Sequence, residues 1–163
     1  MQLIISQNNV TKNLKLKMSW VRIWVHIVFS TKNREPYLSV KEIREKIFQH
    51  IKHYANEKGI WLDTINGYRD HVHCLISLNK EQNISKVVQI LKGESSFWIN
   101  KSQLFKTKFS WQDDYWAVSV SESHIEKVRE YILNQEKHHK YKTFNEEVEE
   151  LMNEYNCKYS KSD

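Results

Sequence analysis

The chain has 163 residues, a formal net charge of +5 and 40% hydrophobic residues. This length suits one domain with a sizeable core and is short for two. Six Trp, eight Tyr and six Phe supply aromatic mass for a core or for stacking on bases, while three Gly and one Pro leave little material for long loops. The composition is that of a globular chain, and its two cysteines, Cys74 and Cys157, exclude a disulfide framework.

Charge is distributed unevenly along the chain. Residues 143–163 hold six acidic and two basic residues, so the remainder is the basic part. A basic body permits a polyanionic partner such as nucleic acid. Residues 1–17 are polar without clear periodicity and are expected to form a flexible extension, and no run of about eighteen apolar residues would span a membrane. The sequence therefore predicts a cytoplasmic protein with no membrane partner.

The predicted helices and strands are separated by clear turn and cap signals. Residues 21–29 alternate as in a half-buried strand, with Val21, Ile23, Val25, Ile27 and Phe29 on one face and Arg22, Trp24, His26 and Val28 on the other. Helical spacing follows up to Gly59, strands are predicted at 60–68 and 70–78, a helix at 84–100 and a strand at 115–120. Three Ser/Thr-x-x-Glu capping boxes, at residues 39–42, 123–126 and 143–146, predict helix N-termini.

The order of these elements is strand, helix, strand, strand, helix, strand and further helices. It predicts an α+β fold with a ferredoxin-like or RRM-like antiparallel four-stranded sheet. A barrel hydrolase needs about 250 residues, and a jelly roll would be nearly all strand. The sequence argues against both of these alternatives.

The segment DHVHCLIS, residues 70–77, places two histidines on one face of a strand. Successive side chains alternate, so His71 and His73 share a face with Leu75 and Ser77, opposite Val72, Cys74, Ile76 and Leu78. Two adjacent imidazoles can hold one divalent metal, and they can equally be a hydrogen-bonded pair at a strand end. The spacing alone leaves both interpretations open.

A third ligand or a nucleophile must then reach this face from another element. In the helix after the fourth strand, Tyr131 and Gln135 are four residues apart, which sets them about 40° and about 6 Å from each other. They can address one site together. The alternative is a boundary tyrosine and an exposed glutamine.

Four separated segments together resemble a known family. They are GYRDHVHCLIS, LKGESSFWIN, WQDDYWAVSVS and VREYILNQ, and they look like the single-tyrosine, His-hydrophobic-His (HUH) transposases of small insertion sequences, the IS200-like family. The resemblance runs from Trp20 to about Lys142. It implies an HUH endonuclease architecture with a transposase domain at residues 18–142, followed by an acidic helix and tail at 143–163. One departure is Trp116, where a smaller residue such as glycine is expected.

The resemblance also implies roles for particular residues. His71 and His73 would bind a divalent metal, Gln135 would supply the third ligand, and Tyr131 would be the nucleophile. The partner would be single-stranded DNA hairpins at the ends of a mobile element. The chain would be a homodimer, in which the tyrosine helix of one subunit can complete the active site of the other.

The chemistry of these residue types agrees with such roles. Attack by Tyr131 on a DNA phosphorus would give a 5'-phosphotyrosine and a free 3'-hydroxyl, and another 3'-hydroxyl could rejoin the strand without ATP. Two neutral imidazoles and one amide oxygen suit magnesium or manganese better than structural zinc. The candidates for phosphate contact are Lys32, Arg34, Lys86 and Lys92.

Two functions from other classes stay open at this point. One is a non-cutting single-stranded DNA-binding regulator derived from such a transposase, and the other is a metal-dependent hydrolase of a small substrate. In neither would Tyr131 form a covalent bond, so trapping a protein–DNA adduct separates both from a transposase. The remaining histidines that could add protons or phosphate contacts, expected to be surface or satisfied groups, are His26, His124, His138 and His139.

Overall fold

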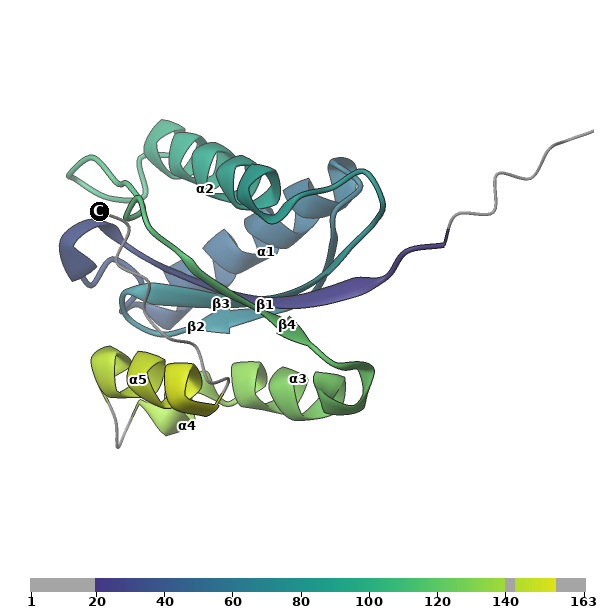
Figure 1. Cartoon of the computed structure of the whole chain (residues 1–163). Helices are drawn as coiled ribbons and strands as arrows, with labels where there is room; N and C mark the ends of the chain where they lie inside the picture. Colours follow the sequence, from purple (N-terminus) through teal and green to yellow (C-terminus); the bar gives the residue numbers. More distant parts are fainter. Residues whose placement is uncertain (1–19, 140–142, 155–163) are drawn as a thin grey trace, which may run out of the picture.

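The computed structural model describes residues 20–139 and 143–154, so the predicted extension at 1–17 lies outside the described residues. Its centre is a four-stranded antiparallel sheet in the order β2-β3-β1-β4 (Figure 1). The strands are β1 (Ile23–Ser30), β2 (Trp61–Gly67), β3 (His71–Leu78) and β4 (Trp116–Val120). The predicted α+β class and element order are confirmed. No helix within the described ranges combines the length and apolar character needed to cross a membrane.

Two long helices cover one face of the sheet. They are α1 (Lys41–Glu57) and α2 (Ile84–Lys101), close to the predicted ranges. The main core lies between these helices and the strands, because apolar side chains at helical spacing meet alternate side chains of the sheet. It includes Ile27, Phe29, Ile47, Ile51, Val72, Cys74, Ile76, Val88 and Leu91.

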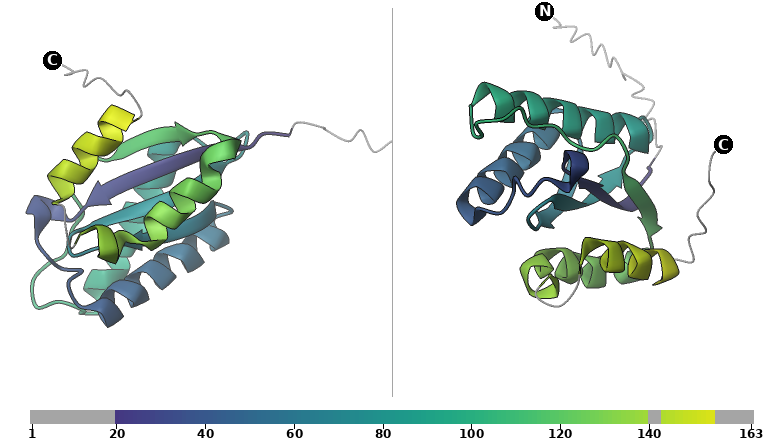
Figure 2. Two further views of the ribbon diagram at one scale, coloured as in Figure 1. Left: turned by 90° about the horizontal axis from the view of Figure 1, so that it is seen from below. Right: turned by 90° about the vertical axis from the view of Figure 1, so that its left-hand side faces the viewer.

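A second layer of helices covers the other face, as both views of Figure 2 show. It consists of α3 (Ile125–Leu133), α4 (Gln135–His138) and α5 (Phe144–Glu154). The prediction of a half-buried first strand is wrong, because this layer also buries Trp24, His26 and Val28. A smaller core forms there from Trp24, Leu75, Val120, Ile125, Val128 and Ile132.

Two of the three predicted capping boxes do not form. The hydroxyl of Ser39 donates to the carbonyl of Pro36 at 2.8 Å, so α1 begins one residue later behind Val40, without a side-chain cap. A short 3-10 helix, η2 (Glu122–His124), precedes α3, and Ser123 is inside it rather than at the cap.

The third box is confirmed at the start of α5. Thr143 donates its backbone N–H and its hydroxyl to Glu146 Oε2, at 2.7 and 2.8 Å, and the Glu146 N–H points back at the Thr143 hydroxyl at 3.4 Å. These reciprocal bonds satisfy polar groups that a helix start leaves unpaired. The acidic terminal helix is therefore present, and it packs against the same sheet face as α3.

Candidate active site

The two histidines of β3 point away from the main core, as predicted. Val72 and Cys74 lie in the main core, whereas His71 and His73 face the layer of α3, α4 and α5 and are fully buried there. Cys74 is a free thiol within the core, where burial raises its pKa. The strand alternation alone therefore aims both imidazoles at one interior space.

Each imidazole is held through its Nδ1 atom. His71 Nδ1 lies 2.8 Å from Asp70 Oδ1, and His73 Nδ1 lies 3.1 Å from Nε2 of His26. Asp70 is itself bound by Arg34, whose Nε and Nη2 atoms donate to Oδ2 at 2.9 and 2.7 Å. Both histidines consequently present Nε2 to the interior, which is how second-shell groups orient metal-binding imidazoles.

Tyr131 and Gln135 reach the same space from the helical layer. The prediction of one continuous helix is wrong, because α3 ends at Leu133 and α4 begins at Gln135, with Asn134 (φ −94°, ψ 17°) between them. Gln135 is nevertheless fully buried, and its Oε1 lies 3.4 Å from His71 Nε2. The ring of Tyr131 is 5.9 Å from that of His73 between centroids.

A carboxylate that the sequence did not single out lies at the centre of this group. Glu147 of α5 is 2% exposed. Its Oε1 accepts hydrogen bonds from the Tyr131 hydroxyl and from Gln135 Nε2, the latter at 2.9 Å. Its Oε2 lies 3.0 Å from His139 Nε2, 3.6 Å from His71 Nε2 and 3.5 Å from His73 Nε2.

The electrostatics of the site follow from this packing. Burial lowers the pKa of His71 to about 4, although the Asp70 bond opposes the shift. Burial and the charge of Glu147 raise the pKa of Tyr131 well above its ordinary value. Burial alone would raise the pKa of Glu147, but hydrogen bonds with His139, His73 and Tyr131 hold it far below its usual range. At neutral pH the site therefore holds neutral His71, protonated Tyr131 and an ionised Glu147.

These residues fit a divalent metal. Ligand atoms of His71, His73 and Glu147 all lie within 4.8 Å of one another, and the buried Nε2 of His73 has no hydrogen-bond partner among the described residues. An ionised Asp70 can only accept, so His71 Nδ1 carries the proton and its Nε2 offers a lone pair. That lone pair faces carbonyl and carboxylate oxygens of Gln135 and Glu147. A cation between such acceptors would relieve their repulsion.

Three supporting residues were not predicted in this role. Asp70 could have been noticed as a carboxylate directly before a histidine predicted to bind metal. His26 and His139 were expected to be surface or satisfied groups. His26 is buried, the side chain of His139 is 5% exposed, and both are hydrogen-bonded at the site. Trp116, the departure from the family pattern, stands edge-on to the ring of His26 at 5.4 Å.

The predicted phosphate-binding residues lie outside this buried group. Lys32 forms an ion pair of 2.7 Å with Asp113, and Lys92 donates to the Asp113 and Asp114 carbonyls at 2.8 and 3.3 Å. Lys86 contacts Gln89 on the exposed face of α2 at 3.1 Å. Arg34 is 35% exposed in its side chain while it binds Asp70.

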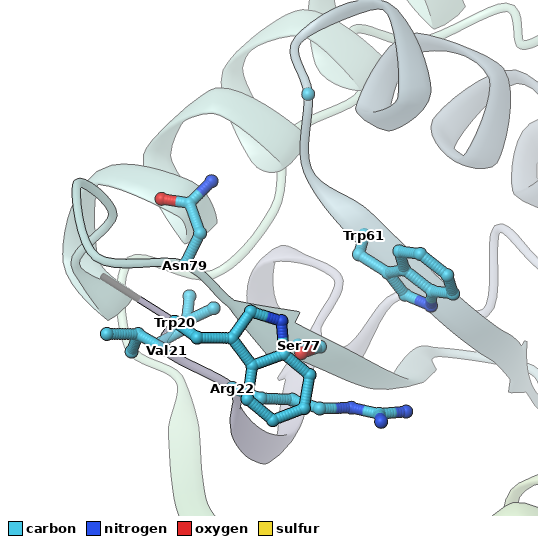
Figure 3. Close-up of a pocket in the computed structure, with 8 residues that line it drawn as sticks. Trp20, Val21, Arg22, Trp61, Ser77 and Asn79 are labelled. Carbon is cyan, nitrogen blue, oxygen red and sulfur yellow. The ribbon is translucent and has the colours of Figure 1, made fainter. Parts of the chain in front are cut away.

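Two hollows of the surface differ in chemistry. A cavity of about 370 Å³ reaches Tyr131 between β4, α3 and α5, and its polar lining includes Ser119, Ser121, His124 and Lys127. Another hollow, at the end of β3 remote from His71, is lined by Trp20, Arg22, Trp61 and Asn79 (Figure 3). Of these two hollows, the first has Tyr131 in its lining and the second does not.

Comparisons with known proteins identify relatives of this chain. A family model described as "Transposase IS200 like" matches residues 19–135. The ISDra2 transposase TnpA of Deinococcus radiodurans is 28% identical over 115 residues, which cover 68% of this chain and 81% of the relative.

Two solved structures share the fold. One, described as a transposase from Deinococcus radiodurans R1, has a TM-score of 0.59 and 24% identity, and the match covers 73% of this chain and 95% of the other. The second is a REP-associated tyrosine transposase bound to a REP hairpin, with a TM-score of 0.56, 14% identity, and coverage of 74% and 71%. The family match spans most of the chain, and this chain therefore belongs to the IS200-like transposase family.

Proposed function

We propose that this transposase cleaves and rejoins single-stranded DNA at insertion-sequence ends through a covalent 5'-phosphotyrosine on Tyr131. In this proposal His71, His73 and Gln135 hold magnesium or manganese. One observation carries it: the Tyr131 hydroxyl and the Nε2 atoms of both histidines converge on the same buried carboxylate, within one chain. A nucleophile and a set of metal-binding atoms are thereby neighbours.

Tyr131 carries the covalent step. Its phenolic oxygen attacks the phosphorus, the new O–P bond forms, and the bond to the 3'-oxygen breaks so that a 3'-hydroxyl leaves. The phenolic proton must leave during this step, because the pKa of Tyr131 is raised. The metal, when bound, neutralises the phosphate and stabilises the leaving oxygen. Rejoining reverses the step with another 3'-hydroxyl, so the energy of the broken bond is kept.

The DNA is proposed to approach through the cavity beside Tyr131. Hydroxyl groups and Lys127 in its lining suit a polar, anionic strand. Lys32, Lys86 and Lys92 would contact phosphates farther along, and the exposed part of Arg34 can do the same while it holds Asp70. The hairpin in the solved relative supports a DNA hairpin as the substrate here, and we propose a homodimer as the assembly.

A covalent adduct tests this mechanism directly. The protein is incubated with Mn²⁺ and a labelled single-stranded oligonucleotide from the ends of its own genetic locus, then run on a denaturing gel. Tyr131→Phe should abolish the labelled protein band because phenylalanine lacks the attacking oxygen. His71→Ala and a chelator should each reduce it by about 100-fold or more, because the metal then lacks a ligand or is removed.

Tyr54→Phe is the matched control, since Tyr54 lies on α1, across the sheet from the site. It should leave the adduct unchanged. An adduct that persists in Tyr131→Phe would assign the nucleophile to another residue. Binding of the correct DNA ends with metal and no adduct would make the chain a non-cutting DNA-binding regulator.

A further inference from the structure

We propose that Glu147 of α5 is an anionic ligand of the catalytic metal and a positioning residue for Tyr131. This inference rests on the proposed function and deepens it. Glu147 lies twelve residues beyond Gln135, where the family match ends. The carboxylate therefore comes from a part of this chain outside the matched segment.

The distances around Glu147 are slightly longer than those of ligands that share an ion, so a small contraction would let these atoms share one. Its Oε2 lies 3.6 Å from His71 Nε2 and 3.5 Å from His73 Nε2. These separations are long for hydrogen bonds, yet two ligand atoms each about 2.1 Å from one metal lie about 3.0 to 3.4 Å apart. Oε1 of Gln135 completes the group, 3.4 Å from His71 Nε2.

The hydrogen-bond inventory points the same way. The ionised Asp70 accepts from Nδ1 of His71, which leaves the Nε2 lone pair of His71 toward Glu147. His26 occupies Nδ1 of His73, so Nε2 of His73 faces Glu147 as well. The amide N–H of Gln135 donates to Glu147 Oε1, and its carbonyl oxygen faces His71 Nε2. The Nε2 lone pair of His71 thus faces the oxygens of Gln135 and Glu147, and a cation between these acceptors satisfies them together.

The two oxygens of Glu147 have separate partners. Oε2 faces the histidines and accepts from His139, whose ring stacks on Tyr68 at 5.2 Å between centroids. Oε1 accepts from the hydroxyl of Tyr131. One side chain therefore links the metal site to the nucleophile and fixes the phenolic oxygen beside it.

A carboxylate changes what the site can hold. His71, His73 and Gln135 are neutral ligands, whereas magnesium and manganese favour carboxylate oxygen. One anionic ligand should therefore strengthen metal binding while leaving a net positive charge for the DNA phosphate.

Manganese binding without DNA tests the proposal. Isothermal titration with Mn²⁺ compares the wild-type chain with Glu147→Gln, which keeps the size of the side chain and removes its charge. We expect the dissociation constant to rise by about tenfold or more. Glu149→Gln, the same change at an exposed position of α5, should leave the constant unchanged. Glu147→Asp keeps the carboxylate and should recover part of the lost affinity.

Each other outcome overturns the proposal. Unchanged Mn²⁺ affinity in Glu147→Gln would remove Glu147 from the ligands, and equal losses in the Gln and Asp variants would make its role structural. If Glu147→Gln gave more covalent adduct than the wild-type chain at the same Mn²⁺ affinity, α5 would be a segment that covers the site and that DNA must displace. Because the titration contains no DNA, its result stands even if the wild-type chain forms no adduct.

Discussion

Asp70 and His26 support the two proposed ligand histidines in different ways. Asp70 gives His71 an ionised partner that Arg34 holds in place, whereas His73 rests on the neutral ring of His26. Burial lowers the pKa of His26 well below its ordinary value, so this ring adds no positive charge behind the metal site. The carboxylate is expected to be the stronger support, because it raises the basicity of its imidazole.

Asp70→Asn should therefore weaken Mn²⁺ binding by about tenfold, because the amide accepts a weaker hydrogen bond from His71 and releases Arg34. Isothermal titration measures the change. Asp113→Asn is the control, since it removes an equal charge from an exposed ion pair with Lys32. Equal affinities for Asp70→Asn and the wild-type chain would show that Asp70 does not tune His71.

At the scale of residues, local pattern predicted a part of the site. Strand alternation placed His71 and His73 together, and helical spacing placed Tyr131 and Gln135 near each other. The position of Glu147 in the site was not predicted, because an acidic residue in an acid-rich helix is usually exposed to solvent. Its burial follows from the docking of α5, where Leu151, one turn on, is also buried. Local sequence patterns do not predict such tertiary packing.

At the scale of elements, the fold was easier to predict than its details. Long periodic segments gave the strands and helices in the right order. Helix starts failed where a nearby group competed for the cap, as the Pro36 carbonyl does for Ser39. The second buried face of the sheet was missed because the helical layer that covers it carries charged and polar residues at the interface, Glu147 and Gln135 among them.

The contact of α3 with the sheet includes a polar link beside its apolar core. β2 shifts register with β3 between Leu62 and Thr64, and Asp63 lies at this irregularity. Arg129 of α3 donates to the Asp63 carboxylate through Nε at 2.9 Å and Nη2 at 3.0 Å. Burial alone would raise the pKa of Asp63, but hydrogen bonds from Arg129 and Thr64 lower it below its ordinary value of 3.8.

Asp63→Asn should lower the free energy of unfolding by about 1 kcal/mol at pH 7, because the paired charge is partly screened by solvent. A pKa lowered in the folded state stabilises the protein above pH 3.8, and this contribution is lost as the pH falls through the folded value. The wild-type advantage should then vanish in acid. Urea titrations at pH 7 and at low pH measure it, and a difference that persists in acid would refute the electrostatic origin.

At the scale of the whole molecule, the proposed nucleophile and the proposed metal-binding atoms come from one chain. The sheet supplies His71 and His73, and the helical layer supplies Tyr131 and Gln135. Figure 2 shows this layer of helices against one face of the sheet. The sequence left open whether the tyrosine serves its own subunit or a neighbour. The hydrogen bond of Tyr131 to Glu147, which itself faces both histidines, favours its own subunit.

Complementation between defective chains tests this expectation. His71→Ala and Tyr131→Phe chains carrying different tags are co-expressed, purified through both tags if they associate, and assayed for the covalent adduct. If the tyrosine acted on a neighbour, the mixed dimer would contain one intact site, formed by Tyr131 of the first chain and His71 of the second. Because both groups belong to one chain here, every site in the mixture lacks one of them, and no adduct should form.

The control is a wild-type chain co-purified with Tyr131→Phe, which should stay active. An adduct from the two defective chains would show that the tyrosine helix is exchanged between subunits.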